Sequence, residues 1–170
     1  MRSLPIKMWA EFQQAVSGLD ENSSSRYVLG IILNWIRSNY ECFMNEPFLR
    51  YGFDRMASID EGMMPVEFST LKSKEVLHFR RVILKYHAKN VESIARFLRD
   101  SIENLITIET DNKCPVYGCW GMIPYVGRYN DLLAFQCKVC GHAHYSNGNK
   151  VGSGELEFAT TEKLKEFQLI

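Results

Sequence analysis

The sequence predicts an α+β fold, with an N-terminal α-helical bundle over residues 1–105 and a small β lobe over residues 106–170. Apolar residues recur at helical spacing through the first hundred residues. After Leu105 the chain changes to short alternating segments rich in glycine, cysteine and aromatic residues. Hydrophobic residues are 46% and charged residues 24% of the 170, which is typical of a folded chain and argues against global disorder.

Five helices are expected in the first part. The second is apolar around most of its circumference, which favours a central place in the bundle. The third begins at a capping Asn45 before Pro47, and the fifth at a capping Asn90. The predicted ranges are about 3–17, 25–44, 45–56, 70–89 and 90–105.

The β lobe is expected to begin at a boundary within residues 106–112. Residues 106–110 alternate apolar and polar side chains, which predicts a strand. Residues 120–136 have the length for two strands and a loop. Thr160 or Thr161 begins a short C-terminal helix, from which Leu164 and Phe167 are expected to dock back.

The formal net charge is zero, from 20 basic and 20 acidic residues, which argues against a surface that wraps nucleic acid throughout. The basic and acidic residues are, however, unevenly distributed along the chain. Residues 1–71 hold 6 basic and 9 acidic side chains, residues 72–99 hold 8 and 2, and residues 100–170 hold 6 and 9. A basic middle of +6 therefore lies between two acidic flanks of −3 each.

Four of the five cysteines lie within 27 residues, as Cys114-x4-Cys119 and, after 17 residues, Cys137-x2-Cys140. The N-terminus lacks the apolar core of a secretory signal, so we expect a reducing, cytoplasmic compartment. There, two close cysteine pairs at this separation indicate one structural Zn²⁺ rather than disulfides. Two tight turns facing each other can supply four thiolates about 2.3 Å from one point.

This arrangement resembles a zinc ribbon over residues 106–150, with Cys114-Pro115 opening the first knuckle and residues 137–141 forming the second. The first knuckle departs from the family pattern because four residues, not two, separate its cysteines. His142 and His144 are therefore alternative ligands, in a site of three cysteines and one histidine. Four thiolates would close the coordination shell, which favours a structural over a catalytic zinc.

The basic middle carries a stripe of cations on its predicted helix. Spacings of four, three, four and four residues place them opposite the apolar face, as a surface for phosphates or an acidic protein, or simply as a solvated face. The stripe consists of Lys74, His78, Arg81, Lys85 and Lys89.

Aromatic side chains of the β lobe are the second candidate surface. They could stack on bases or contact a protein, although several must fill the lobe's own core. The six are Tyr117, Trp120, Tyr125, Tyr129, Phe135 and Tyr145, of which Trp120, Tyr125 and Tyr129 are our candidates for partner contact.

No phosphate-binding glycine loop, nucleophile elbow or zinc-hydrolase motif occurs in the sequence. We therefore expect a non-catalytic protein that binds a macromolecule, most simply another protein, as adaptors, regulators, toxin-immunity proteins and inhibitors do. The alternative is a nucleic-acid-binding regulator that uses the basic helix and the aromatics of the β lobe. No stretch has the roughly 18 apolar residues of a membrane span.

Overall fold

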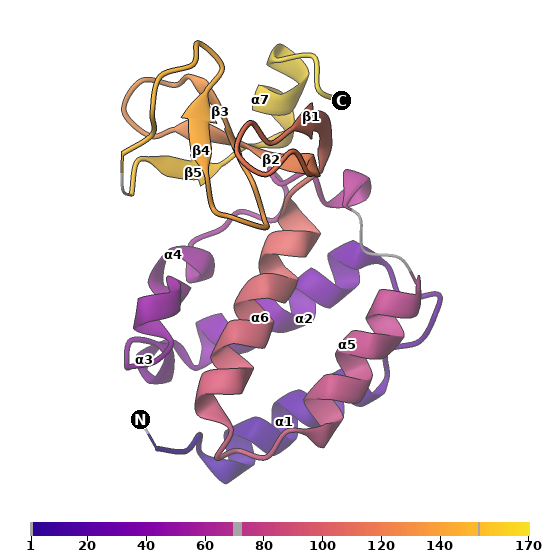
Figure 1. The fold of residues 1–170 in the computed structure, drawn as a ribbon. Helices are drawn as coiled ribbons and strands as arrows, with labels where there is room; N and C mark the ends of the chain where they lie inside the picture. The colour runs from indigo at the N-terminus through magenta and orange to yellow at the C-terminus, as the bar shows by residue number, and fades with distance from the viewer. Residues whose placement is uncertain (1, 70–72, 153) are drawn as a thin grey trace. The chain divides into compact units, whose positions relative to one another are not determined.

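A computed structural model describes residues 2–69, 73–152 and 154–170 (Figure 1). The α+β prediction is confirmed, since helices precede an antiparallel sheet. The described residues divide into two compact units. The helical unit holds residues 2–61 and 73–105, and the β unit holds residues 62–69 together with residues after 105. Residues 62–69 thus belong with the sheet.

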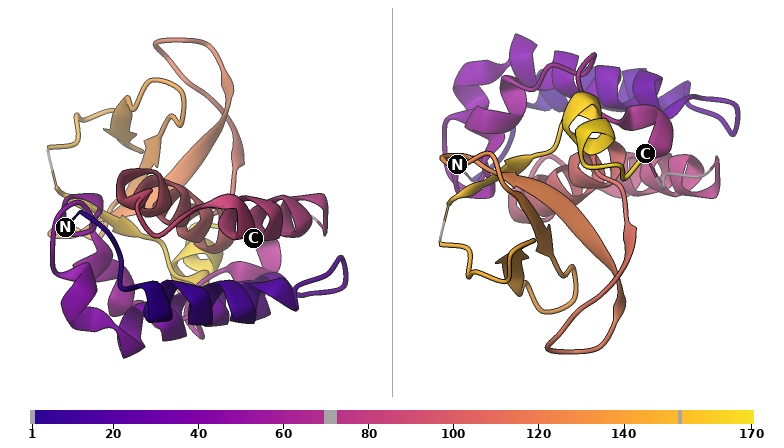
Figure 2. Two further views of the ribbon diagram at one scale, coloured as in Figure 1. Left: turned by 90° about the horizontal axis from the view of Figure 1, so that it is seen from below. Right: turned by 90° about the horizontal axis from the view of Figure 1, so that it is seen from above.

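The helical unit contains six α-helices and one short 3₁₀ helix in its described part. Their bounds are α1 Ile6–Ser17, α2 Ser25–Ser38, α3 Tyr40–Phe43, η1 Leu49–Tyr51, α4 Phe53–Ala57, α5 Ser73–Lys85 and α6 Val91–Ile106. Figure 2 shows these helices from two further directions. The amphipathic pattern of the sequence explains how these helices pack, because the apolar stripe of each long helix is buried.

Aromatic rings fill the centre of the helical unit. Trp35 of α2 stacks on Phe12 of α1 with ring centroids 4.1 Å apart, and its indole N–H donates to the Met8 carbonyl. Phe43 lies 4.9 Å from Trp35 and 5.5 Å from Phe53. The central place predicted for α2 is confirmed by its six buried side chains.

Two predicted helices end earlier than expected. The second stops at Ser38, where the Asn39 side chain donates to the Trp35 carbonyl, and the chain resumes as α3. The basic helix stops at Lys85, so Lys89 lies beyond it, in a turn; the prediction of a single stripe through Lys89 is wrong there. The predicted start of this helix at Thr70 lies outside the described residues.

The β unit contains five described strands and two short helices. Their bounds are η2 Val66–Phe68, β1 Thr110–Lys113, β2 Trp120–Gly127, β3 Leu133–Gln136, β4 Ala143–Tyr145, β5 Leu156–Phe158 and α7 Thr161–Glu166. The strands pair antiparallel in the order β1-β2-β3-β4, and β5 also pairs with β2. The predicted hairpin over residues 120–136 is confirmed as β2 and β3.

The strand predicted at residues 106–110 is wrong, because α6 runs on through Ile106 and β1 begins at Thr110. Leu105 and Ile106 continue the buried stripe of the helix, and that period outweighs the local alternation. The C-terminal helix is confirmed, with the Thr160 hydroxyl accepting from the Lys163 N–H and Leu164 buried. Among the described residues, no helix combines the length and apolar character that a membrane span requires.

Candidate metal centre

Two short turns carry the four clustered cysteines. The first, residues 114–119, joins β1 to β2, and the second, residues 137–142, joins β3 to β4. Each turn begins directly after one strand and ends directly before the next. The pairing of the sheet therefore fixes both ends of both turns.

The two turns have the same backbone hydrogen bonds. In the first, the Cys114 N–H donates to the Cys119 carbonyl at 2.8 Å and the Gly118 N–H to the Cys114 carbonyl at 2.8 Å. In the second, the Cys137 N–H donates to the His142 carbonyl at 2.9 Å and the Gly141 N–H to the Cys137 carbonyl at 2.9 Å.

Glycine is the fifth residue of each turn. Gly118 has φ +67° and Gly141 has φ +72°, in the left-handed region where a side chain is disfavoured. By this equivalence Tyr117 has the fourth position of its turn, which Cys140 has in the second turn. Cys119 has the sixth position, which is occupied by His142 in the second turn.

The cysteine sulfurs converge between the turns. The Sγ atoms of Cys114, Cys137 and Cys140 all lie within 4.8 Å of one another. Cys114 Sγ is 3.6 Å from Cys140 Sγ, and Cys119 Sγ is 3.2 Å from Cys137 Sγ. Four sulfurs at 2.3 Å from a tetrahedral Zn²⁺ would be about 3.8 Å apart. The cluster is therefore of the size that a tetrahedral metal needs.

The sulfurs lie in an apolar setting. Cys114 and Cys137 are buried in a cluster with Met122 of β2 and Phe135 of β3. The Tyr117 N–H points to Cys114 Sγ at 3.5 Å. Backbone N–H groups directed at sulfur favour the thiolate form, which is the form that binds a metal.

Local hydrogen bonds separate the acidities of the thiols. The Cys140 N–H stabilises the Cys137 thiolate, and this outweighs burial and lowers the pKa of Cys137 to about 6. The hydrogen bond to Cys137, together with burial, raises the pKa of Cys119 to about 11. At Cys140 the His142 N–H favours the thiolate, but burial and the neighbouring sulfurs outweigh it and raise the pKa. The lowered pKa of Cys137 thus favours its thiolate near neutral pH, whereas the thiols of Cys119 and Cys140 need a nearby cation to ionise.

Among the described residues, neither His142 nor His144 joins the sulfur cluster. His144 on β4 is half-buried, and its ring lies 6.1 Å from Phe135 and 5.6 Å from His142. Burial lowers the pKa of His144, and the neighbouring His142 acts in the same direction. The sulfur at the sixth position of the first turn, Cys119 Sγ, lies 3.2 Å from Cys137 Sγ.

The cations predicted as a partner surface are solvent-exposed. On α5, Lys74, His78, Arg81 and Lys85 share one exposed face, opposite the buried side chains of the same helix. Lys89 is also exposed but lies after the helix. Within the described part of the chain, none of the lysines or Arg81 forms an ion pair.

The predicted aromatic candidates differ in exposure. Trp120 is 70% and Tyr129 79% exposed, whereas Tyr125 is half-buried with its ring 5.7 Å from Phe158. Tyr117 is exposed as well, so three of the six aromatic side chains are exposed. The Lys113 ammonium lies 5.7 Å from the centre of the Trp120 ring.

Sequence reasoning missed two apolar side chains at the metal centre. Val116 and Val139 each have the third position of their turn, and they are 60% and 70% exposed. A signal for them was available, because residues 114–118 and 137–141 share the pattern Cys-x-Val-x-Gly. Aligning the turns on their first cysteines would have shown the equivalence that the cysteine spacing hides.

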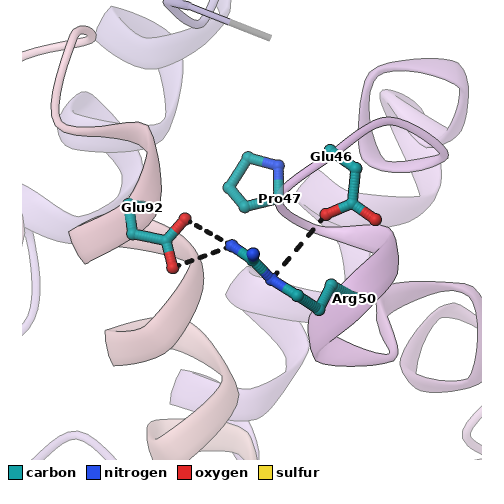
Figure 3. A pocket seen from close by; sticks show the side chains of 4 residues that line it. All are labelled: Glu46, Pro47, Arg50 and Glu92. Atoms are coloured by element: carbon teal, nitrogen blue, oxygen red, sulfur yellow. Dashed lines mark hydrogen bonds and ion pairs between the residues drawn. The ribbon is translucent and has the colours of Figure 1, made fainter.

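A separate pocket of about 380 Å³ lies in the helical unit, lined by Glu46, Pro47, Arg50 and Glu92 (Figure 3). The Arg50 guanidinium donates to both carboxylate oxygens of Glu92, at 3.0 and 2.8 Å, and lies 3.8 Å from the Glu46 carboxylate. The Tyr51 hydroxyl donates to Glu92 at 2.6 Å. The charged side chains that line the pocket are therefore paired with one another, and the pocket is not a strong candidate for a ligand site.

The metal centre is the chemically distinctive feature of the described chain. The clustered thiols could hold a metal ion, and sulfur ligands suit soft or borderline cations. Compared with protein-family models, curated proteins and solved structures, the chain matches none of them.

Proposed function

We propose that this chain is a zinc-binding protein in which one structural Zn²⁺, held by Cys114, Cys119, Cys137 and Cys140, stabilises a zinc-ribbon-like β unit. The convergence of the sulfurs, three within 4.8 Å of one another and the fourth 3.2 Å from Cys137, carries this proposal. Four thiolates leave no open coordination position, so the metal acts on folding rather than on a substrate. A small β unit has a marginal core, and zinc binding adds directly to its folding free energy.

The fifth cysteine offers a matched control for the metal. Cys137→Ser is expected to abolish zinc binding, whereas Cys42→Ser, a change of the same chemistry in the helical unit, keeps one zinc per chain. Metal analysis of the purified variants measures both. Limited proteolysis should show faster cleavage after residue 106 in Cys137→Ser alone. Wild-type protein without metal, or zinc retained by Cys137→Ser, contradicts the proposal.

We further propose that the β unit acts by binding a protein. The exposed side chains of the two turns and the start of β2, which we call the knuckle surface, support this role. The knuckle surface consists of Val116, Tyr117, Trp120 and Val139. Exposed aromatic and aliphatic side chains beside a rigid metal centre are typical of the central contacts in protein interfaces.

Charge favours a protein over nucleic acid as the partner of the β unit. Residues 100–170 have a formal charge of −3, and a zinc with four thiolates adds about −2. Three of the cations there are already in ion pairs: Arg128 with Glu157, Lys138 with Glu109, and Lys163 with Asp131 and Glu166. A phosphate backbone would be repelled from such a surface.

A tagged purification from the native cell tests the protein-binding role. We expect a partner protein to co-purify at a fixed molar ratio to the chain, both with and without nuclease treatment. The double variant Val116→Ser with Trp120→Ser should abolish recovery of this partner while its zinc content is unchanged. Tyr40→Ser, at an exposed aromatic of the helical unit, is the matched control and should retain the partner. Recovery that is lost on nuclease treatment, or that is insensitive to the knuckle-surface variant, contradicts this role.

A further inference from the structure

The exposed face of α5 is a row of basic side chains with no acidic residue in it. Lys74, His78, Arg81 and Lys85 lie within one narrow arc of the helix, since they are four, three and four residues apart. Glu75, the one carboxylate of α5, lies about a quarter turn away. We call these four residues the cationic face.

The cationic face is held on a rigid support. On the opposite side of α5, Val76, Phe79 and Ile83 are buried, and Phe79 stacks on Phe97 of α6 at 5.6 Å. With this backing the helix backbone is already ordered before its exposed face meets a ligand, so binding does not have to order it.

The C-terminal end of α5 is also fixed. The Gln13 side-chain amide donates to the carbonyls of Ile83 at 3.0 Å and Tyr86 at 3.1 Å. The Trp9 indole N–H donates to the same Tyr86 carbonyl at 3.0 Å. Two residues of α1 therefore satisfy carbonyls that a helix end leaves open, and they hold Lys85 and its neighbours in place.

The charges of the cationic face are not balanced internally. Lys74, Arg81 and Lys85 are exposed, and in the described ranges each is without an ion-pair partner. By contrast, Arg50 and Arg99 on the same unit are paired with carboxylates. Cations left free on an ordered helix are available to an external anion.

We propose that the cationic face of α5 binds the phosphate backbone of a nucleic acid. From Lys74 to Lys85 the helix rises about 16 Å. Phosphates of one strand advance about 3.4 Å along the duplex axis, so the face spans about five of them. This surface is separate from the knuckle surface, and the inference does not rest on the proposed zinc function.

Salt dependence gives the size of the effect. Contacts from Lys74, Arg81 and Lys85 predict a slope of about −2.7 in a plot of log affinity against log salt concentration. Affinity should therefore fall about 40-fold between 50 and 200 mM salt. With Arg81→Ala and Lys85→Ala, one strong contact remains, and the same change in salt should weaken binding only about 3- to 4-fold.

The test uses the full chain and labelled duplexes of about 20 base pairs, one of DNA and one of RNA, followed by fluorescence anisotropy from about 20 mM salt upward. The matched control is Arg55→Ala with Lys165→Ala, which removes the same charge from two exposed positions off the cationic face. The duplex that binds, DNA or RNA, identifies the type of nucleic acid. With that duplex we expect the control variant to keep the wild-type salt slope.

Three results would overturn the proposal. One is the absence of binding to both duplexes at the lowest salt. Another is an equal loss of slope in the control variant, because that would reflect overall charge rather than this face. The third is displacement of the duplex by poly-L-glutamate as readily as by unlabelled duplex, which would assign the face to an acidic protein.

Discussion

The equivalence of the two turns predicts that the fourth zinc ligand can be moved. Cys119→Ser removes the sulfur from the sixth position of the first turn. Adding Tyr117→Cys to it places a thiol at the fourth position, where the second turn has Cys140. Because the backbone hydrogen bonds of the turns match, this thiol should face Cys137 as Cys140 faces Cys114.

The expected magnitudes follow from the geometry. Cys114 and Cys140, at the first position of one turn and the fourth of the other, bring their sulfurs to 3.6 Å, close to the tetrahedral separation of about 3.8 Å. The relocated pair should reach a similar value. Loss of an outer-shell partner alone costs roughly 10- to 100-fold in metal affinity, so losing the Cys119 ligand should cost more than about 100-fold. The double variant should recover most of that loss.

Competition with a chromophoric chelator measures the zinc affinities, and the absorption of a Co²⁺-substituted sample reports the number of thiolates bound. Cys42→Ser should behave as wild type in both measurements. The reasoning is refuted if the double variant binds zinc as weakly as Cys119→Ser alone. It is refuted equally if Cys119→Ser keeps wild-type affinity and a four-thiolate spectrum, since Cys119 would then not be a ligand.

Three further predictions concern protons and packing. Because the pKa of Cys137 lies near 6 while those of Cys119 and Cys140 are raised, zinc uptake at neutral pH should release the protons of Cys119 and Cys140. Below pH 6 Cys137 also protonates, so the release measured with a pH indicator should rise by about one proton and affinity should fall more steeply. Gly127→Ala should destabilise the protein by about 1–3 kcal/mol in urea unfolding, since the new Cβ would meet the Asn130 side chain and the Tyr145 ring, the latter at 2.7 Å. Gly18→Ala, whose new Cβ would lie 3.9 Å from the Ala15 carbonyl oxygen, an ordinary contact distance, should cost little. Phe43→Ala should cost about 3–5 kcal/mol because Phe43 is fully buried among aromatic rings, whereas Tyr40→Ala at an exposed position should stay within about 0.5 kcal/mol, and equal losses would contradict the packing described.

The sequence predicted the fold class and most helices because periodicity is a local property. Met8, Trp9 and Phe12 recur at helical spacing and are buried, as that period requires. Helix ends were harder to place. The stop at Ser38 depends on a side-chain hydrogen bond from Asn39, and the end of α5 depends on Gln13, which is about seventy residues away in the chain. Interactions of that kind have no local pattern.

The clustering of the cysteines was predictable from their spacing, but the equivalence of the two turns that carry them was not predicted. Counting residues between cysteines made the first turn look irregular. Counting from Cys114 to Gly118 and from Cys137 to Gly141 makes the two turns alike, because the backbone geometry depends on the glycine rather than on the second ligand. The spacing rule expects the second cysteine at the fourth position of each turn, as Cys140 is. In the first turn the second cysteine, Cys119, stands two residues later, at the sixth position.

The two proposed surfaces should respond differently to salt. On the proposed knuckle surface the exposed side chains are aliphatic or aromatic, and zinc held by four thiolates would add negative charge nearby, so affinity for a protein there should change little with ionic strength. On the cationic face, binding depends on counterion release and should weaken steeply. The formal charge of zero thus combines two acidic flanks with a basic middle. A partner whose binding is insensitive to salt belongs to the β unit, and one lost at moderate salt belongs to α5.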